Sequence, residues 1–337
     1  MRILITGGCG FIGSHVIREI LNTPGVESIV NLDALTYSGN PTNLIDIEDE
    51  RYKFYHGSIN DASLVSSILI EEEIGVVLNL AAESHVDRSI DSSATFFRTN
   101  VEGTRILLEC MKGIKALGRT IHLVHISTDE VYGSLGPEEP EFTENSPLKP
   151  RNPYSASKAS SDLLVNAFVN TFGISAVVTR CSNNYGPNQF PEKLIPLMTM
   201  RALEGEKMPV YGDGEQIRDW IHVSDHAKGI IFTMKGLMDG LLSPGEVINF
   251  GASNEVRNID LVRKIVSLTG ASEDKIEFVD DRLGHDKRYA MGYERAKEVL
   301  GWEPKVDWGT GLKETIYWYK NNPVWIGKIL DGSYQTL

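Results

Sequence analysis

The feature that most constrains the fold is a glycine-rich segment after the first apolar run of the chain. Residues 2–6 read Arg-Ile-Leu-Ile-Thr, which is typical of a buried parallel strand. Glycines follow at positions 7, 8, 10 and 13, and an apolar pattern of helical period begins at Phe11. Glycines in this arrangement allow a tight turn and let the backbone approach a phosphate group. The segment therefore predicts a strand–turn–helix unit whose helix N-terminus binds the diphosphate of a dinucleotide.

An acidic residue indicates which dinucleotide would bind. Asp33 ends the next apolar run, residues 29–33, and lies about 20 residues beyond the glycine loop. A carboxylate at this place accepts a hydrogen bond from a ribose 2′-hydroxyl and repels a 2′-phosphate. We therefore expect NAD as the cofactor rather than NADP.

Strand and helix patterns alternate through the first half of the chain. Strands are predicted at 52–55, 76–80, 122–126 and 176–180, and helices at 61–73, 93–117 and 153–172. Such alternation is typical of an α/β fold with a doubly wound parallel sheet, the Rossmann arrangement. We expect residues 1–185 to form this domain and residues 186–337 to form mainly a smaller substrate-binding lobe. Part of about 221–251 could return to the main domain, because residues 247–250 read as a strand.

Two short segments carry the candidate chemistry. Tyr154 and Lys158 are four residues apart, which places both side chains on one face of a helix. An ammonium beside the phenol would lower the pKa of Tyr154 and make it a base for an alcohol. Asp129 and Glu130 follow a predicted strand, and adjacent carboxyls in a closed pocket keep one of the pair protonated. This pair suggests a second reaction after alcohol oxidation, although two solvated loop acids remain an alternative.

Charge and composition argue against several classes of partner. Lys and Arg total 33 and Asp and Glu total 46, so the net charge of −13 disfavours nucleic acid and anionic membranes. No apolar run approaches the roughly 18 residues of a membrane span, and the early first strand leaves no room for a signal peptide. Cys9, Cys110 and Cys181 lack the spacing of a metal site. We expect reduced thiols, no metal and a cytoplasmic location.

Several motifs together carry a family resemblance. They are the segments 7–13, 35–40, 81–89, 128–130, 182–187, 218–220 and 284–289, and the Tyr154/Lys158 pair. Along nearly its whole length the chain resembles the extended short-chain dehydrogenase/reductases, and within them the dTDP-glucose 4,6-dehydratase family. The glycine loop and the Tyr/Lys pair are shared by the whole superfamily. The Thr-Asp-Glu, Ala-Ala-Glu-Ser-His and Gly-His-Asp sequences are more specific.

The resemblance implies a three-stage reaction on dTDP-glucose, with NAD regenerated in each turnover. Tyr154 would take the proton of the 4-hydroxyl while hydride leaves carbon 4. Glu130 would remove the proton on carbon 5, and Asp129 would protonate the departing 6-hydroxyl. Hydride would then return to carbon 6 to give the 4-keto-6-deoxy sugar. Thr128 would hydrogen-bond the oxygen on carbon 4, and Lys158 would contact the nicotinamide ribose.

Further positions carry over from the resemblance as binding residues. The expected cofactor contacts are Gly7, Gly10, Phe11, Ile12, Gly13, Asp33, Thr36, Ser58, Ile59, Ala81, Ala82, Thr99, Tyr154, Lys158 and Asn184. The expected substrate contacts are Ser84, Thr128, Asn183, Lys193, Leu194, Pro209, Tyr211, Arg218, Asn258, His285 and Tyr289. Two positions depart from the family: Ser58 replaces an aspartate that binds the adenine amino group, and Leu283 replaces a proline. We expect the Ser58 departure to change only the affinity for the cofactor, and the Leu283 departure to loosen only the Gly-His-Asp loop.

Other functions remain open at this point. They are a UDP-glucose 4,6-dehydratase, a nucleotide-sugar 4-epimerase or decarboxylase, a GDP-mannose dehydratase, and an NAD-binding regulator without catalysis. Asp129 argues against the epimerase, and the decarboxylase and GDP-mannose enzymes more usually have serine there. The intact Tyr/Lys pair argues against the regulator.

Proteins that resemble this chain pair through two long helices, which here span 93–117 and 153–172. We therefore expect a homodimer. The expected interface residues are Ile106, Leu107, Leu163, Leu164 and Phe168. The alternative is that these residues face only the sheet.

Overall fold

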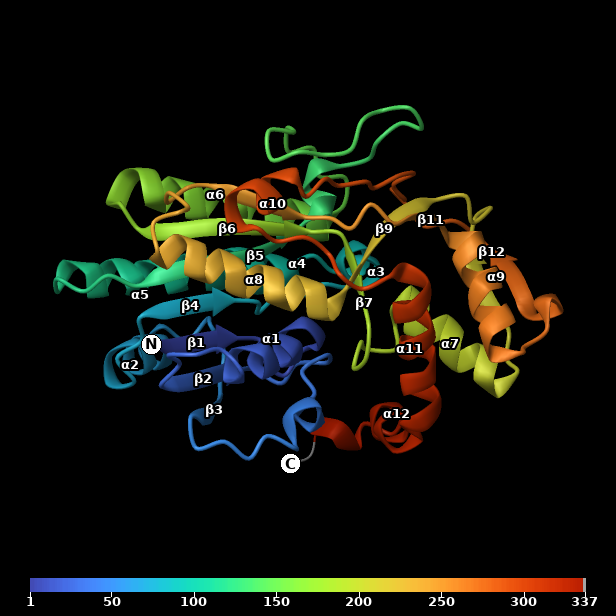
Figure 1. The fold of residues 1–337 in the computed structure, drawn as a ribbon, viewed down its shortest axis with the longest axis horizontal. Helices are drawn as coiled ribbons and strands as arrows, with labels where there is room; N and C mark the ends of the chain where they lie inside the picture. Colours follow the sequence, from blue (N-terminus) through green and yellow to red (C-terminus); the bar gives the residue numbers. More distant parts are fainter. Residues whose placement is uncertain (336–337) are drawn as a thin grey trace.

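The computed structural model describes residues 1–335, which form a sheet-centred body with a smaller lobe beside it (Figure 1). Within these residues the main sheet has seven parallel strands in the order β10-β6-β5-β4-β1-β2-β3. The strands are β1 Arg2–Thr6, β2 Ser28–Asp33, β3 Tyr52–His56, β4 Val76–Asn79, β5 His122–Thr128, β6 Ser175–Cys181 and β10 Val247–Phe250. The predicted doubly wound parallel sheet is confirmed. Its strand order reverses between β1 and β4, where such folds bind ligands.

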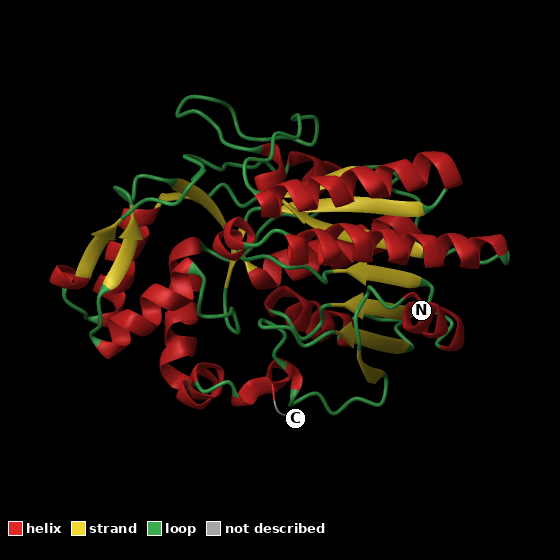
Figure 2. Cartoon of the chain, turned by 180° about the vertical axis from the view of Figure 1, so that it is seen from behind, coloured by secondary structure: helices red, strands yellow, loops and turns green. Residues whose placement is uncertain are grey.

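Helices cover both faces of the sheet (Figures 1 and 2). One face carries α1 Phe11–Leu21, α8 Val223–Met238 and α10 Glu294–Leu300, and the other carries α2 Ala62–Glu71, α5 Thr104–Ala116 and α6 Pro153–Phe172. Strand side chains alternate between two cores: Ile3 and Ile5 pack in the first, and Leu4 packs in the second. Because both faces are covered, strands such as β1 and β4 are almost entirely buried, whereas the edge strand β3 is largely exposed.

The predicted helix over 93–117 is present but is not uniform. It consists of α4 Ala94–Phe96, a π-helical segment η2 Phe97–Gly103, and α5. In the π-helical segment Asn100 is buried, and its amide donates to the carbonyl oxygen of Glu83 at 3.0 Å and to the hydroxyl of Ser157 at 2.9 Å. These bonds join the helix to the loop after β4 and to α6. Apolar periodicity alone does not reveal a π segment, which often marks a functional site.

The smaller lobe packs around its own core and two short sheets. Its strands are β7 Asn183–Tyr185, β8 Met208–Tyr211, β9 Ile217–His222, β11 Glu255–Arg257 and β12 Ile276–Val279, and its helices are α7 Leu194–Glu204, α9 Asn258–Thr269, η4 Glu273–Lys275 and α11 Trp308–Asn321. The chain then returns through α12 Pro323–Leu330 and η5 Ser333–Gln335 to the loop after β2 (Figure 1). There the indole N–H of Trp325 donates to Oδ1 of Asn43 at 2.8 Å. Asn43 belongs to the short helix η1 Pro41–Leu44. Two more short helices follow strands of the main sheet: α3 Val86–Asp91 comes after β4, and η3 Asp129–Tyr132 comes after β5.

The prediction that Leu107 and Phe168 lie in a dimer interface is wrong. Leu107 and Phe168 are 0% and 8% exposed and pack against the sheet in the second core. Leu163 on the same helix pair is 60% exposed, whereas Ile106 and Leu164 are partly buried. Helix periodicity identifies two apolar flanks on these helices, but it does not tell which flank faces the sheet.

Candidate active site

Two cavities open at the carboxyl ends of the main-sheet strands and share a wall. The larger, of about 320 Å³, is lined by the glycine loop, the ends of β4 and β5, and α6. The smaller, of about 210 Å³, is lined mainly by the smaller lobe. The residues that line both are Glu130, Asn183, Asn184, Gln189, Glu192 and Lys193. A group bound in one cavity would therefore meet a ligand in the other beside Glu130.

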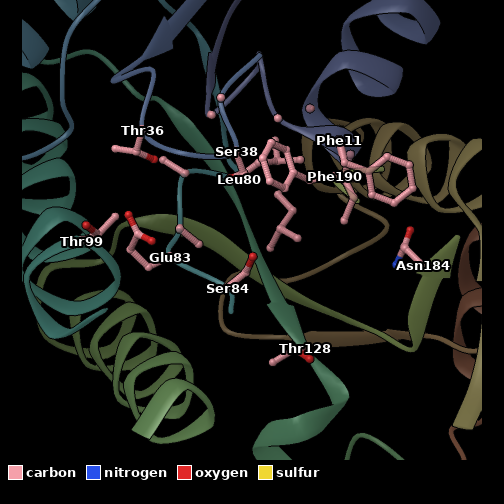
Figure 3. Close-up of a pocket in the computed structure, with 18 of the residues that line it drawn as sticks. Phe11, Thr36, Ser38, Leu80, Glu83, Ser84, Thr99, Thr128, Asn184 and Phe190 are labelled. Carbon is pink, nitrogen blue, oxygen red and sulfur yellow. The ribbon is translucent and has the colours of Figure 1, made fainter. Parts of the chain in front are cut away.

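Every residue predicted to contact the cofactor lines the larger cavity. These residues are Gly7, Gly10, Phe11, Ile12, Gly13, Asp33, Thr36, Ser58, Ile59, Ala81, Ala82, Thr99, Tyr154, Lys158 and Asn184. Figure 3 shows how far apart in the sequence they originate, with Thr36 and Thr99 toward one end of the cavity and Phe11 and Asn184 toward the other. The cavity thus extends across the carboxyl ends of several main-sheet strands, as a dinucleotide site requires.

The glycine loop leaves no room for side chains. A β-carbon on Gly13 would lie 2.3 Å from the carbonyl oxygen of Gly7, and one on Gly7 would lie 2.8 Å from the backbone of Ala81. Gly7 also has a φ of +72°, which side-chain-bearing residues rarely adopt. No side chain caps α1 at Gly10, so its first N–H groups remain available to an anion. The loop therefore fits the diphosphate of a dinucleotide.

Asp33 is positioned beside this loop by two backbone bonds. Its Oδ2 accepts from the N–H of Cys9 and its Oδ1 from the N–H of Leu35, both at 2.8 Å. Burial raises the pKa of Asp33, while the two backbone bonds lower it. Each oxygen can accept a further hydrogen bond. The carboxylate therefore fits the hydroxyls of an adenosine ribose.

The segment predicted to carry the chemistry begins where β5 ends. The hydroxyl of Thr128 donates to Oδ1 of Asp129 at 3.2 Å and accepts from the N–H of Glu130 at 3.3 Å. Tyr154 and Lys158 approach the same cavity from α6. The structure thus brings together all five residues that the sequence placed in the chemistry. Figure 3 shows Thr128 on the strand that runs toward this end of the cavity.

Asp129 lies in an environment that favours its protonated form. Burial raises its pKa well above the ordinary value, and the neighbouring carboxylates of Glu130 and Asp219 raise it further. Its side chain is 2% exposed, and within residues 1–335 its Oδ2 has no hydrogen-bond partner. A protonated oxygen of this kind can donate to a ligand. The alternative of a solvated loop acid is therefore wrong for Asp129.

Glu130 lies in a different electrostatic environment. Burial raises its pKa too, but the ammonium of Lys193 acts in the opposite direction, as do Asn152 and the guanidinium of Arg218. The amide of Asn152 donates to Oε2 of Glu130 at 3.3 Å. Arg218 also lowers the pKa of Asp129, although less than the two carboxylates raise it. Cations and an amide thus oppose the effect of burial at Glu130, whereas neighbouring carboxylates add to it at Asp129.

The expectation that Lys158 lowers the pKa of Tyr154 is wrong for the protein alone. Burial raises the pKa of Tyr154 well above its ordinary value, and Glu130 raises it further. The ammonium of Lys158 donates to the carbonyl oxygen of Ile126 at 2.6 Å, and burial lowers the pKa of the lysine. Both side chains line the cavity, but sequence spacing does not reveal their desolvation. The phenolate therefore needs a further positive charge in the cavity.

The predicted substrate residues divide between the two cavities. Ser84 and Thr128 line the larger, and Asn183 and Lys193 line both. The residues found in the smaller cavity are Leu194, Pro209, Tyr211, Arg218, Asn258, His285 and Tyr289.

Arg218 is oriented for binding an anion. Its guanidinium lies 4.3 Å from the ring centroid of Tyr289 and donates to two backbone carbonyl oxygens at 2.8 and 2.9 Å. Lys193 approaches from the other side of the shared wall, with burial lowering the pKa of its ammonium. Cations fixed in this way in an acidic protein fit a diphosphate.

Several residues of the site escaped the sequence reasoning, and Asn152, Phe190 and Glu192 are examples. Asn152 caps α6 and contacts Glu130, and an Asn-Pro pair before a helix is a signal that could have indicated it. Phe190 and Glu192 line the larger cavity from a segment without periodic pattern. Glu192 accepts a hydrogen bond from the hydroxyl of Tyr37 at 2.9 Å, a contact that no local signal predicts.

Two kinds of feature are absent from the described part of the chain, residues 1–335. Among residues 1–335 no three His, Cys, Asp or Glu side chains are grouped to hold a metal ion. In the same residues no helix combines the length and apolar character of a membrane span.

The chain is similar to known proteins along almost its whole length. A sequence model described as GDP-mannose 4,6 dehydratase matches residues 4–315. A dTDP-glucose 4,6-dehydratase from Escherichia coli is 47% identical over 99% of this chain and 98% of that protein. DesIV, a dTDP-glucose 4,6-dehydratase from Streptomyces venezuelae solved with NAD bound, is 42% identical with a TM-score of 0.91, covering 96% of this chain and 98% of that one. A UDP-glucose 4-epimerase from Thermotoga maritima is 30% identical with a TM-score of 0.85, covering 96% of this chain and 100% of that one.

Proposed function

The chain belongs to the GDP-mannose 4,6 dehydratase family, and we propose that it acts within that family as a dTDP-glucose 4,6-dehydratase. The reaction converts dTDP-glucose to dTDP-4-keto-6-deoxyglucose and water, with NAD as the oxidant that is regenerated in each turnover. Similarity to dTDP-glucose 4,6-dehydratases over 99% of the chain supports this activity.

The observation that carries the proposal is the burial of Asp129 beside Glu130, which raises the pKa of Asp129 and leaves its Oδ2 without a hydrogen-bond partner among residues 1–335. Hydroxide is a poor leaving group, so elimination of water near neutral pH needs a carboxylic acid that keeps its proton. A 4-epimerase shares the fold but only inverts a carbon that keeps its hydroxyl, and it needs no such acid. The pair therefore favours the dehydratase over the epimerase.

We assign one proton-transfer role to each catalytic side chain. Tyr154 accepts the proton of the sugar 4-hydroxyl, and the Thr128 hydroxyl orients the same oxygen. Glu130 removes the proton on carbon 5, which the new ketone at carbon 4 acidifies. Asp129 gives its proton to the 6-hydroxyl, which leaves as water. Glu130 then returns a proton to carbon 5 as carbon 6 is reduced.

NAD in the larger cavity would accept a hydride from carbon 4 and return it to carbon 6. The glycine loop would hold its diphosphate, Asp33 its adenosine ribose and Lys158 its nicotinamide ribose. Tyr154 would become a base once the positive charge of the oxidised cofactor lies in the same cavity, because that charge stabilises the phenolate. Arg218 and Lys193 would hold the diphosphate of the substrate in the smaller cavity.

The activity is tested by mixing purified protein with dTDP-glucose and analysing the product. We expect a 4-keto sugar that absorbs in alkali and shows a 6-methyl group by proton NMR. No product, or a product that keeps its 6-hydroxyl, would contradict the assignment. UDP-glucose in parallel tests the nucleotide, and we expect a clearly lower kcat/KM for it.

We also propose a division into two domains and a homodimer. Residues 1–185 would form the NAD-binding domain and residues 186–337 mainly the substrate lobe, with β10 and α8 packing on the main sheet in support. A homodimer would form through α5 and α6, where Leu163 is 60% exposed and Leu117 is 72% exposed. Apolar side chains left exposed along neighbouring helices are typical of an interface.

A further inference from the structure

A buried charge network lies behind the catalytic helix, and the proton transfers assigned above do not use it. Asp162 on α6 is 3% exposed, and its Oδ2 accepts from Nε of Arg180 on β6 at 3.0 Å. Nη1 of Arg180 donates to the hydroxyl of Tyr132 at 2.8 Å, and this hydroxyl donates to Oδ1 of Asn249 at 2.9 Å. Burying a charged pair is costly, and replacing it with apolar side chains is often neutral. Its presence in the core of a parallel sheet therefore needs an explanation.

Asp162 lies one helical turn after Lys158 on the same face of α6. Residues four apart on a helix are neighbours. Lys158 is 4% exposed, and while burial lowers the pKa of its ammonium, Asp162 raises it. The Oδ1 of Asp162 has no hydrogen-bond partner among residues 1–335 and lies 3.8 Å from Nε2 of His125. The carboxylate is thus hydrogen-bonded to Arg180 through one oxygen. Burial raises the pKa of Asp162, whereas Arg180, Lys158 and the hydroxyl of Ser127 lower it.

The other titratable groups near Lys158 do not supply a negative charge that would favour its ammonium form. His125 on β5 is neutral, because burial lowers its pKa well below the ordinary value. Burial raises the pKa of Cys181 on β6 and that of Tyr154 on α6, so both are uncharged in the protein alone. On η3, burial and Glu130 raise the pKa of Asp129, and Glu130 lies among the cations of the smaller cavity. Asp162 is therefore the anion whose charge acts on the lysine.

We propose that Asp162 is a positioning residue that supplies the negative charge needed to keep Lys158 an ammonium in a dry site. The inference rests on the proposed function, in which Tyr154 becomes a phenolate in the presence of the oxidised cofactor. An ammonium at Lys158 adds positive charge to the cavity that both side chains line. Arg180 holds the carboxylate in place, and neither Asp162 nor Arg180 is among the residues that line the two cavities. The pair acts on the reaction only through Lys158.

Four variants separate this role from a purely structural one. Asp162→Asn removes the charge but leaves Arg180 buried without a counter-charge, which can destabilise the fold. The double variant D162N/R180M removes both charges and leaves no unpaired cation, and Asp162→Glu restores the negative charge. Asp225→Asn is the matched control, because Asp225 is a 2% exposed carboxylate on α8 whose Oδ2 accepts from two backbone N–H groups at 2.8 Å.

The pKa of Lys158 is read directly by NMR titration of protein labelled with ε-¹³C-lysine, with the resonance assigned from a Lys158→Met spectrum. The second readout is the pH dependence of NADH formation on mixing with dTDP-glucose. In Asp162→Asn and in the double variant we expect the lysine pKa and the alkaline limb of the rate to fall by about one pH unit or more. Asp162→Glu and Asp225→Asn should keep the wild-type values.

A wild-type lysine pKa in the double variant would overturn the proposal, even if turnover falls. An unchanged alkaline limb together with a lowered melting temperature would do the same, because it assigns Asp162 to folding alone. If the wild-type protein fails to turn over dTDP-glucose, the proposed function fails instead, and the NMR titration still decides whether Asp162 holds the proton on Lys158.

Discussion

Replacing Asp129 by Asn should separate oxidation from dehydration. Asparagine keeps the shape of the side chain and can still accept from the hydroxyl of Thr128, now 3.2 Å from Oδ1, but it cannot deliver a proton. Loss of a general acid typically costs about 10²–10⁴-fold in rate, which corresponds to about 2.7–5.4 kcal/mol in the barrier. Oxidation at carbon 4 depends on Tyr154 and should continue. We therefore expect bound NADH to accumulate toward one equivalent per active site when Asp129→Asn meets dTDP-glucose.

Stopped-flow absorbance of NADH and NMR of the product measure the two stages separately. Glu130→Gln should behave in the same way if Asp129 and Glu130 act in one elimination step. Turnover of Asp129→Asn at the wild-type rate would refute the assignment of the acid. Absence of NADH in this variant, with NAD bound, would show that Asp129 also serves the oxidation.

The same substitution has a consequence for stability. Because burial raises the folded pKa of Asp129, the folded protein binds this proton more tightly than the unfolded chain. The contribution of this proton to the free energy of unfolding is fully present below the unfolded pKa of about 3.9. It is lost as pH rises through the folded pKa of Asp129. Thermal unfolding of cofactor-free protein should therefore show Asp129→Asn more stable than wild type at neutral pH, with a difference that shrinks toward pH 4. A difference independent of pH would contradict the raised pKa.

Three further outcomes are expected. Tyr154→Phe should form no NADH with dTDP-glucose, since the first proton has no acceptor; a normal NADH signal would exclude Tyr154 as the base. Protein stripped of cofactor should bind NAD more tightly than NADP in calorimetry, because Asp33 repels a 2′-phosphate, and equal affinities would contradict this role. Leu163→Asp should convert a dimer into a monomer in light scattering at micromolar concentration, and an unchanged mass would place the interface elsewhere.

The sequence predicted the sheet because its strands are buried on both faces. Apolar runs such as residues 2–6 and 122–126 are typical of buried parallel strands when helical patterns separate them. The glycine loop and Asp33 are equally local signals, and all the cofactor contacts expected from them line one cavity. The bounds of α6, Pro153–Phe172, are marked by a capping residue before a proline and a glycine after the last turn.

What the sequence could not predict depends on distant contacts. The raised pKa of Tyr154 comes from burial and from Glu130, which lies on another element. Phe190 and Glu192 reach the cavity only because the segment before α7 folds back over it, and the buried side of α5 and α6 is set by the sheet. Spacing along a helix shows which side chains share a face, but not the dielectric environment of that face.

The central claim is that one hydride leaves carbon 4 and returns to carbon 6 of the same sugar while Asp129 and Glu130 remove water between the two steps. It is tested most directly with dTDP-glucose carrying deuterium on carbon 4, converted by the wild-type protein in ordinary water. We expect the product to carry that deuterium in its 6-methyl group, as read by NMR. Deuterium retained on carbon 4, or lost to solvent with the 6-hydroxyl intact, would contradict the account.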